Sequence, residues 1–293
     1  MTLRQTLSGA RQVLASHNII DAPLECELLL RYALNISRVQ LYQDLNRRLS
    51  PKEEADFGQL IKRCLSGEPT AYITGHREFY GLDFYIDRRV LIPRPESELL
   101  VEKALYLAQH KPVFTIADIG TGSGAIAISL ALGLPQAKIY ATDISAPALE
   151  VAQFNCQRHG VADRICLLEG DMLDPLPEPV DLIIANLPYV RELEVSRTGL
   201  ASFEPLLALN GGRDGLEKIR RLCRRVSDKL QPRGCLLLEI GQGQSRAVAS
   251  FLCGLFPSAK IEITPDLSGI DRVVGLTLTT TTASELELLS EAA

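Results

Sequence analysis

The chain has 293 residues, 46% hydrophobic and 23% charged, a composition typical of a globular protein with room for two domains. Its net charge of −5 argues against a broad phosphate-binding surface, so we expect no direct nucleic-acid partner. No apolar run approaches the roughly 20 residues that span a bilayer, and the N-terminus lacks the apolar core of a signal peptide, so no membrane association is expected.

The first seventy residues predict a small helical domain. Apolar residues recur at helical spacing from Leu3 to Leu14, and a second helix is expected around residues 24–30. The sequence Ser50-Pro51-Lys52-Glu53 combines an N-cap serine, a proline at the first helical position and a glutamate that completes a capping box. The helix that begins there should end at Gly67.

Residues 71–95 predict a β-hairpin linker. The stretch from Ala71 to Val90 is rich in Tyr, Phe and Ile and is interrupted by Gly75 and Gly81. Pro93-Arg94-Pro95 closes it, and a helical pattern resumes from Glu96. Arg94 and Glu98 could shape the lid of a pocket, or could equally form a surface salt bridge.

Residues 96–280 alternate between apolar strands and amphipathic helices, which predicts an α/β fold with a Rossmann-like, doubly wound sheet. Because residues 264–271 are too few for a crossover helix, the last two strands should form an antiparallel hairpin at one edge. Residues 281–293 form a polar tail. The sheet is expected to have six or seven strands, with candidates at residues 114–119, 138–142, 165–168, 180–185, 235–240, 260–263 and 273–278.

The cysteines and histidines indicate a reducing compartment and no metal site. Seven cysteines are scattered without a C-x-x-C pair, and most lie among apolar residues, as buried thiols do. The four histidines have no ligand spacing either. We therefore expect a cytoplasmic protein without bound metal, and nothing in the sequence requires more than a monomer.

A glycine-rich loop, Asp118-Ile119-Gly120-Thr121-Gly122-Ser123-Gly124-Ala125, follows the first strand of the predicted sheet. Glycines let the backbone pass close to a ligand, and the next helix supplies N–H donors. Gly120, Gly122 and Ala125 satisfy the dinucleotide pattern G-x-G-x-x-G/A. Gly120, Gly122 and Gly124 equally fit the G-x-G-x-G loop of S-adenosylmethionine (SAM) methyltransferases. Residues 120–124 are therefore candidate cofactor-binding residues for either ligand.

Acidic residues near three strand ends help to distinguish SAM from a dinucleotide as the cofactor. Asp143, at the end of the second strand, could accept hydrogen bonds from both ribose hydroxyls of either cofactor. Asp118 would lie near the cationic methionine end of SAM, whereas it would repel a pyrophosphate. Asp171 could accept from an adenine amino group while Met172 packs on the ring, although an N-cap or loop role explains Asp171 equally well.

The tetrapeptide Asn186-Leu187-Pro188-Tyr189 ends the fourth strand, at the sheet edge where α/β proteins bind ligands. The Asn186 oxygen and a neighbouring backbone carbonyl can each accept one N–H of a planar –NH2 group, while the tyrosine ring covers its plane. The nitrogen lone pair then faces an electrophile. The alternative is a strand end with a proline turn and a core tyrosine. We identify residues 186–189 as candidate catalytic and substrate-binding residues, with Asn186 also touching the cofactor, and this favours SAM.

Motifs along most of the chain are similar to those of one family. They are found at residues 67–75, 77–82, 91–98, 118–124, 186–189, 203–205 and 208–216. This set resembles the HemK/PrmC family, the N5-glutamine methyltransferases of peptide chain release factors. The resemblance implies a helical substrate-docking domain, a hairpin linker and a SAM-dependent catalytic domain. It also implies the glutamine of a Gly-Gly-Gln loop as the substrate.

Two positions depart from the usual family pattern. Ser97 stands where the family has threonine and keeps the hydroxyl. Leu187 stands where the family has proline, and it keeps the backbone carbonyl through which that position acts. Asn-Leu-Pro-Tyr also occurs in ribosomal RNA adenine dimethyltransferases, so an RNA adenine-N6 methyltransferase is one alternative. A non-catalytic SAM-fold docking module is another, although the intact glycine loop, Asp143 and Asn186 argue against it.

Overall fold

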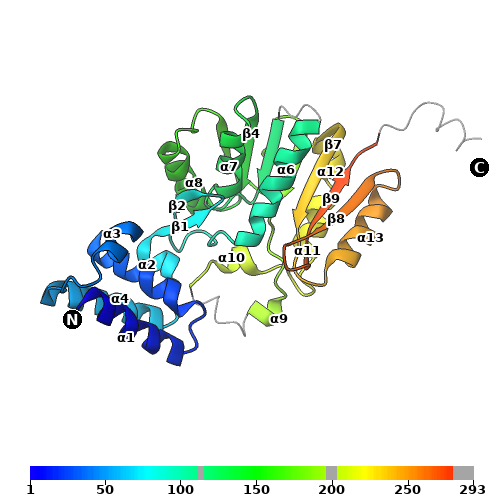
Figure 1. The fold of residues 1–293 in the computed structure, drawn as a ribbon. Helices are drawn as coiled ribbons and strands as arrows, with labels where there is room; N and C mark the ends of the chain where they lie inside the picture. Colours follow the sequence, from blue (N-terminus) through cyan, green and yellow to red (C-terminus); the bar gives the residue numbers. More distant parts are fainter. Residues whose placement is uncertain (111–114, 196–202, 280–293) are drawn as a thin grey trace, which may run out of the picture. The chain divides into compact units, whose positions relative to one another are not determined.

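A computed structural model describes residues 1–110, 115–195 and 203–279 of the chain. It divides into two compact units, Met1–His76 and Arg77–Ala293. Figure 1 shows the elements of both units in chain order.

The first unit is helical. Its capping box is as predicted, because Ser50 Oγ accepts from the Glu53 N–H at 3.3 Å and the Glu53 carboxylate accepts from the Ser50 N–H at 2.8 Å. The helix that begins there ends at Leu65, two residues before Gly67, which has a positive φ of 89°. Helix α3 was not predicted, because six residues are too few to show helical periodicity. The helices are α1 (Leu3–Ser16), α2 (Ala22–Leu34), α3 (Arg38–Gln43), α4 (Pro51–Leu65) and α5 (Thr70–Thr74).

The hairpin is shorter than the sequence indicated. Strands β1 (His76–Phe79) and β2 (Leu82–Tyr85) form a two-stranded sheet, joined by Tyr80 and Gly81 with φ values of 52° and 70°. Two positive φ values are typical of a type I′ hairpin turn. The prediction that the hairpin begins at residue 71 is wrong, since residues 70–74 form helix α5. Ile73 is buried with the apolar side chains of the helical unit, and this packing overrides the strand propensity of the stretch.

The second unit contains a seven-stranded sheet with the order β5-β4-β3-β6-β7-β9-β8. Strands β3 to β7 are parallel, whereas β9 pairs antiparallel with β7 and β8, which confirms the predicted edge hairpin. Strand β7 begins five residues before the predicted start. Residue 114 and the predicted tail 281–293 lie outside the described residues. The strands are β3 (Thr115–Ile119), β4 (Lys138–Asp143), β5 (Ile165–Glu169), β6 (Val180–Ala185), β7 (Leu230–Glu239), β8 (Lys260–Pro265) and β9 (Asp271–Thr277).

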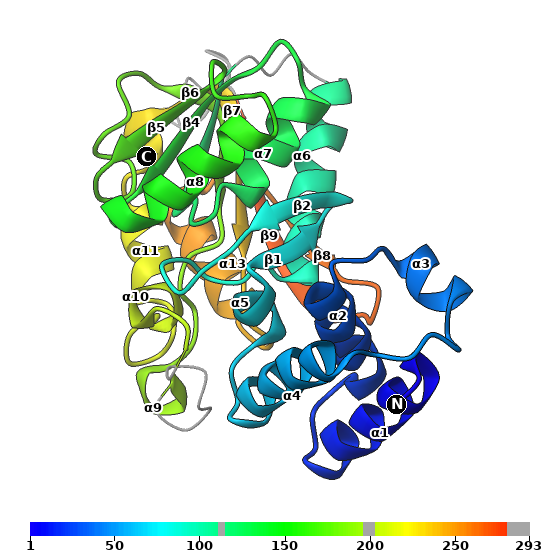
Figure 2. The same cartoon turned by 90° about the vertical axis from the view of Figure 1, so that its left-hand side faces the viewer.

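Helices cover both faces of this sheet (Figure 2). The 3-10 turn η1 (Pro95–Ser97) leads into α6 (Glu98–His110), which lies with α7 (Ala125–Gly133) and α8 (Ala146–Arg158) on one face. Helices α11 (Glu217–Cys223), α12 (Val226–Lys229) and α13 (Ser245–Leu255) cover the other face, and the short α9 (Glu192–Val195) and α10 (Leu206–Leu209) follow β6. The strand order changes direction between β3 and β6, and open α/β sheets bind ligands at such a point.

Within the described ranges, no helix is both long and apolar enough to pass through a membrane, and no three metal-ligating side chains gather at one place. Five of the seven cysteines are buried, as predicted. Cys166, on the edge strand β5, and Cys253 are exposed.

Candidate active site

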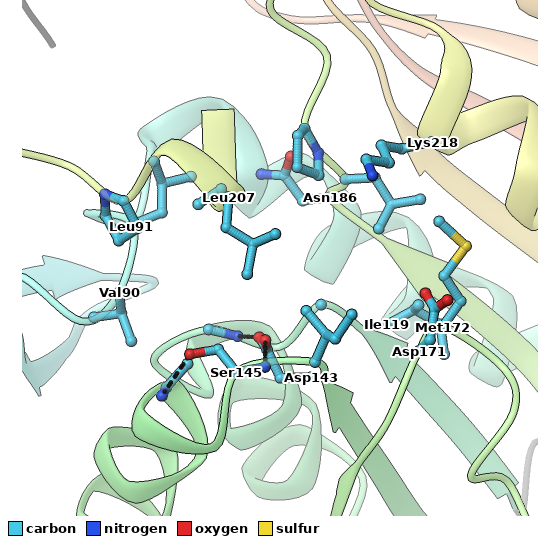
Figure 3. A pocket seen from close by; sticks show the side chains of 18 of the residues that line it. Val90, Leu91, Ile119, Asp143, Ser145, Asp171, Met172, Asn186, Leu207 and Lys218 are labelled. Carbon is cyan, nitrogen blue, oxygen red and sulfur yellow. Dashed lines mark hydrogen bonds between the residues drawn. The ribbon is translucent and has the colours of Figure 1, made fainter. Parts of the chain in front are cut away.

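A cleft lies at the carboxyl ends of β3, β4, β5 and β6, with about 900 Å³ of empty space, part of it open to solvent. Asp143 lies on one side and Asn186 on the other, with Met172 near one end and Val90 and Leu91 near the opposite end (Figure 3). Of the predicted site residues, those that line the cleft are Gly120, Gly122, Asp143, Asp171, Met172, Asn186, Leu187 and Pro188. Those that do not line it are Asp118, Thr121, Ser123, Gly124 and Tyr189.

The glycine loop takes a backbone path that requires glycine. Gly120, Gly122 and Gly124 have φ values of 74°, 55° and 81°, which side-chain-bearing residues rarely adopt. The N–H groups of Gly120 and Thr121 both donate to the Thr142 carbonyl, at 2.8 and 2.9 Å. The loop is thus held against the end of β4. At Gly120 and Gly122 the backbone itself borders the cleft, because glycine has no side chain.

The Asp143 carboxylate is fixed by two backbone donors. Its Oδ2 accepts from the Gly122 N–H and its Oδ1 from the Ser145 N–H, each at 2.9 Å (Figure 3). Burial raises the pKa of Asp143, and these two hydrogen bonds act in the opposite direction. Each carboxylate oxygen can accept a further hydrogen bond, so the side chain is oriented in advance for two hydroxyls of a ligand.

Asp118 lies behind the loop. It is 1% exposed, and its Oδ2 accepts from the Thr121 hydroxyl at 2.7 Å. Burial raises the pKa of Asp118 to about 6, and the hydrogen bond from Thr121 lowers it. Asp118 therefore holds the loop in place, while its proximity to the methionine end of SAM stays a prediction.

Asn155 is a site residue that the sequence reasoning missed. This fully buried residue of α8 donates to the Ser123 carbonyl at 2.9 Å and to the Tyr85 carbonyl at 3.0 Å, and it accepts from the Tyr85 N–H at 2.9 Å. It thereby links the glycine loop to the hairpin. The available signal was a polar residue among the buried positions Val151, Ala152 and Cys156 of a helix.

Asp171 lines the cleft but is already engaged, because it forms a salt bridge with Arg221 of α11. No helix begins at Asp171, so the N-cap interpretation is wrong and it is a loop acid. The neighbouring Met172 has a positive φ of 53°, and its carbonyl accepts from the Thr142 hydroxyl at 3.0 Å. Only one carboxylate oxygen of Asp171 meets Arg221, so the other can still accept from a ligand.

Two oxygens of the tetrapeptide, at the rim of the cleft, have no hydrogen-bond partner among the described residues. Asn186 Nδ2 donates to Ser97 Oγ at 2.8 Å, and across the described residues its Oδ1 accepts no hydrogen bond. Leu187 is 6% exposed, and its side chain lies next to Gly120. Where the structure is described, the Leu187 N–H and carbonyl have no hydrogen-bond partner either. Asn186 Oδ1 and the Leu187 carbonyl are therefore both available as acceptors.

Tyr189 is held by residues behind the cleft. Its hydroxyl donates to Glu239 Oε1 at 3.2 Å, and its carbonyl accepts from Gln244 Nε2 at 3.1 Å. Burial and then the charge of Glu239 raise the pKa of Tyr189, so the hydroxyl remains a donor. A Cβ on Gly211 would lie 2.7 Å from the Pro188 carbonyl oxygen and 2.8 Å from Tyr189 Cα. Glycine at this position lets the neighbouring loop pack directly on the backbone of the tetrapeptide.

One side of the cleft depends on an ion pair between Arg94 and Glu204. The Arg94 guanidinium donates to Glu204 Oε2 at 2.6 Å, and Glu204 Oε1 accepts from the Ile92 N–H at 3.2 Å. Glu204 is 3% exposed. Residues on both sides of the pair, among them Leu91 and Pro205, line the cleft. Arg94 thus forms a salt bridge, and Glu98 accepts from the Tyr80 N–H; neither residue lines the cleft itself, and a lid role for them stays a prediction.

We expect Arg94→Ala to lower thermal stability and SAM affinity together, because it leaves a buried carboxylate with a single donor. Arg94 is one-third exposed, so we expect a loss of about 1–3 kcal/mol in the free energy of unfolding rather than the larger cost of a fully buried pair. Thermal melts and calorimetry with SAM measure both effects. Arg246→Ala, an exposed arginine of α13, is the matched control. An Arg94→Ala protein with parental melting temperature and SAM affinity would contradict the role of the pair.

The residues of the cleft fit SAM. The oriented carboxylate of Asp143 suits the ribose hydroxyls, and the glycine loop lets SAM lie close to the backbone at Gly120 and Gly122. Apolar side chains from Ile119, Ile144 and Met172 provide surface for a purine ring.

Comparisons with known proteins identify the family of this chain. Two family models match, the PrmC N-terminal domain over residues 5–75 and the methyltransferase small domain over residues 96–203. The release factor glutamine methyltransferase of Moorella thermoacetica is 43% identical, covering 93% of this chain and 97% of that protein. The enzyme of the same name from Geobacter sulfurreducens is 39% identical, covering 94% and 96%. The hMettl16 catalytic domain in complex with MAT2A 3′UTR hairpin 6 is similar in fold, with a TM-score of 0.55 at 17% identity over 69% of this chain and 77% of that chain. This chain belongs to the release factor glutamine methyltransferase family.

Proposed function

We propose that this protein transfers a methyl group from SAM to the side-chain amide nitrogen (N5) of the glutamine in the Gly-Gly-Gln motif of peptide chain release factors. This modification would support translation termination. The observation that carries the proposal is the pair of available acceptors, Asn186 Oδ1 and the Leu187 carbonyl, at the edge of the Asp143 cleft. The identity to enzymes of this name over almost the whole chain supports it.

Asp143 would hold the ribose hydroxyls, Gly120 and Gly122 would pass under the methionine part, and Asp171 and Met172 would contact the adenine. SAM supplies an electrophilic methyl group: as the new N–CH3 bond forms, the S–CH3 bond breaks to leave a neutral thioether, and one amide proton passes to solvent.

The contribution of the protein is to position and polarise the glutamine amide. An amide nitrogen is a poor nucleophile, because its lone pair is delocalised into the carbonyl. When Asn186 Oδ1 and the Leu187 carbonyl each accept one N–H, they orient the nitrogen and stabilise the positive charge that develops on it. Tyr189 would hold the plane of the amide. Positioning does most of the work, and no general base is needed before methyl transfer.

Mass spectrometry of a release factor after incubation with the protein and SAM tests the proposal. We expect one added methyl group on the Gly-Gly-Gln peptide and none on a release factor in which that glutamine is alanine. Methylation of RNA adenine in place of the glutamine would support the RNA alternative. SAM binding without methylation of either would support a docking module.

We further propose that the protein acts as a monomer in the cytoplasm, without binding nucleic acid directly. One chain supplies both the cleft and the two acceptors, and the net charge is −5. Light scattering tests whether the protein is a monomer. RNA binding with a steep salt dependence would contradict the proposal that it does not bind nucleic acid directly.

We propose that the helical unit docks the release factor. It has its own buried core and exposes the apolar side chains of Ile20 and Val39. Removal of residues 1–70 should therefore leave SAM affinity unchanged but raise the Michaelis constant for the release factor. Calorimetry with SAM and steady-state kinetics measure the two quantities. An unchanged Michaelis constant with a lower melting temperature would assign the unit to stability alone.

Leu187→Pro is expected to keep glutamine methylation within roughly tenfold of the parent, a barrier change under about 1.4 kcal/mol. Proline retains the carbonyl acceptor, and the Leu187 N–H has no partner to lose among the described residues. The buried leucine side chain is shortened, so a modest loss of stability, about 1 kcal/mol, should accompany it. Kinetics and thermal melts check both. Complete loss of methylation in a folded, SAM-binding variant would show that Leu187 acts through more than its carbonyl.

A further inference from the structure

The buried carboxylate of Glu239 lies behind the tetrapeptide, at the end of β7. It is 1% exposed and does not line the cleft. Its Oε1 accepts from the Tyr189 hydroxyl at 3.2 Å, whereas no group in the described residues donates a hydrogen bond to its buried Oε2. Burying a charge is costly unless hydrogen bonds or an opposite charge compensate it, so the groups next to Glu239 are candidates to supply that compensation.

Ser97 connects this carboxylate to Asn186. The serine is 3% exposed, and its Oγ accepts from Asn186 Nδ2 at 2.8 Å. The Ser97 hydroxyl lies near enough to the Glu239 carboxyl group to lower its pKa, although the described structure records no hydrogen bond between them. A hydroxyl has one hydrogen and two lone pairs, so a hydrogen directed at Glu239 leaves the lone pairs for Asn186.

The direction of this hydrogen bond decides which end of the Asn186 carboxamide faces the substrate. A carboxamide can turn by half a rotation and exchange its oxygen for its NH2 group. If Ser97 donated to Asn186, the oxygen would point at Ser97 and the NH2 group would meet the –NH2 of the glutamine. Two donors would then face each other, and the acceptor would be lost.

We propose that Glu239 is a positioning residue that makes Ser97 accept from Asn186, so that Asn186 presents Oδ1 to the glutamine amide. The same carboxylate holds the Tyr189 hydroxyl. One buried charge therefore orients both side chains of the tetrapeptide that act on the amide. This inference rests on the proposed function and adds to it a residue outside the cleft.

The inference requires Glu239 to be ionised. Burial raises its pKa to about 6, with Glu96 of η1 acting in the same direction and Ser97, Tyr189 and Arg272 of β9 opposing. As the pH falls through about 6, Glu239 gains a proton and Ser97 is free to donate to Asn186. We therefore expect kcat to fall on the acid side of about pH 6. Asp118 titrates in the same range, but it acts on the glycine loop and its effect belongs to SAM affinity.

The test is a double-mutant cycle with Ser97→Ala and Glu239→Gln, in which kcat, both Michaelis constants and SAM affinity are measured. Glutamine keeps the shape of the side chain but can donate toward Ser97. Each single change should lower kcat roughly 10- to 100-fold, with SAM affinity almost unchanged. The kcat of the double variant should be no lower than that of the slower single variant, because Glu239 acts on Asn186 through Ser97 and the two losses are therefore not independent. Ser97→Thr should retain activity, and Glu262→Gln, an exposed carboxylate on β8, is the control.

A Glu239→Gln protein with parental kcat, or losses that multiply in the double variant, would overturn the inference. If Glu239→Gln fails to fold, the contrast between Ser97→Ala and Ser97→Thr decides, and equal kcat values for these two variants would overturn it. Carboxyl-carbon NMR of the parent protein gives an independent reading, with a signal that titrates near pH 6 and is missing from Glu239→Gln. Absence of glutamine methylation by the parent would contradict the proposed function itself, whereas an active parent with unaffected variants contradicts this inference alone.

Discussion

Asn186→Ala is expected to lower kcat for glutamine methylation by about 10²-fold or more, the usual cost of deleting one transition-state hydrogen-bond partner. The alanine removes Oδ1, the acceptor that the Ser97 hydrogen bond leaves available. SAM affinity should fall less than kcat, because the oriented carboxylate of Asp143 is unaffected. Single-turnover kinetics with a release factor and calorimetry with SAM separate the two quantities.

Two further variants sharpen this result. Asn186→Asp keeps oxygens at the position of the amide but cannot donate to Ser97, so it should also be slow. Asn46→Ala removes an exposed asparagine of the helical unit and should behave as the parent. Near-parental turnover in Asn186→Ala would exclude the two-acceptor mechanism.

Asp143→Ala is expected to weaken SAM binding by 100-fold or more. Two charge-assisted hydrogen bonds to ribose are each worth about 1.5–3 kcal/mol, and partial solvent exposure reduces their sum to roughly 3 kcal/mol. The substitution also leaves the Gly122 N–H without its acceptor, which should loosen the glycine loop. Calorimetry measures the affinity, and circular dichroism checks the fold.

Asp143→Asn provides a stricter comparison. The parent carboxylate accepts from two N–H groups, those of Gly122 and Ser145, whereas asparagine has only one oxygen and must turn its NH2 group toward one of them. We therefore expect this nearly isosteric change to be almost as harmful as alanine. Asp163→Ala, an exposed aspartate, is the control. If both Asp143 variants bound SAM as the parent does, the assignment of Asp143 to the cofactor would be wrong.

Much of the fold was predictable from local patterns. Alternating apolar strands and helices predicted the seven-stranded sheet, because a strand buried on both faces must be apolar along its length. Gly120 follows β3, Asp143 ends β4 and Asn186 follows β6, and the carboxyl ends of these parallel strands meet at one edge. For this reason residues far apart in the sequence could be assigned to one cleft before any contact was known.

Local patterns were misleading where packing decided the conformation. Residues 71–74 have the Tyr and Ile content of a strand but form α5, because Ile73 is buried with the helical unit. The place of Asp118 near the methionine end of the cofactor stays a prediction, and packing adds a local role that the sequence did not indicate, because its carboxylate accepts from the Thr121 hydroxyl.

The amino-acid sequence by itself determined the sheet, the glycine loop and the tetrapeptide, since each depends on periodicity or on residues adjacent in the chain. The tertiary structure alone revealed the partners that orient them. Asn186 meets Ser97 from 89 positions away, Tyr189 meets Glu239 from 50, and Arg94 meets Glu204 from 110. Such pairs leave no periodic signal, because a side-chain hydrogen bond depends on the distance in space between two groups and not on their separation along the chain.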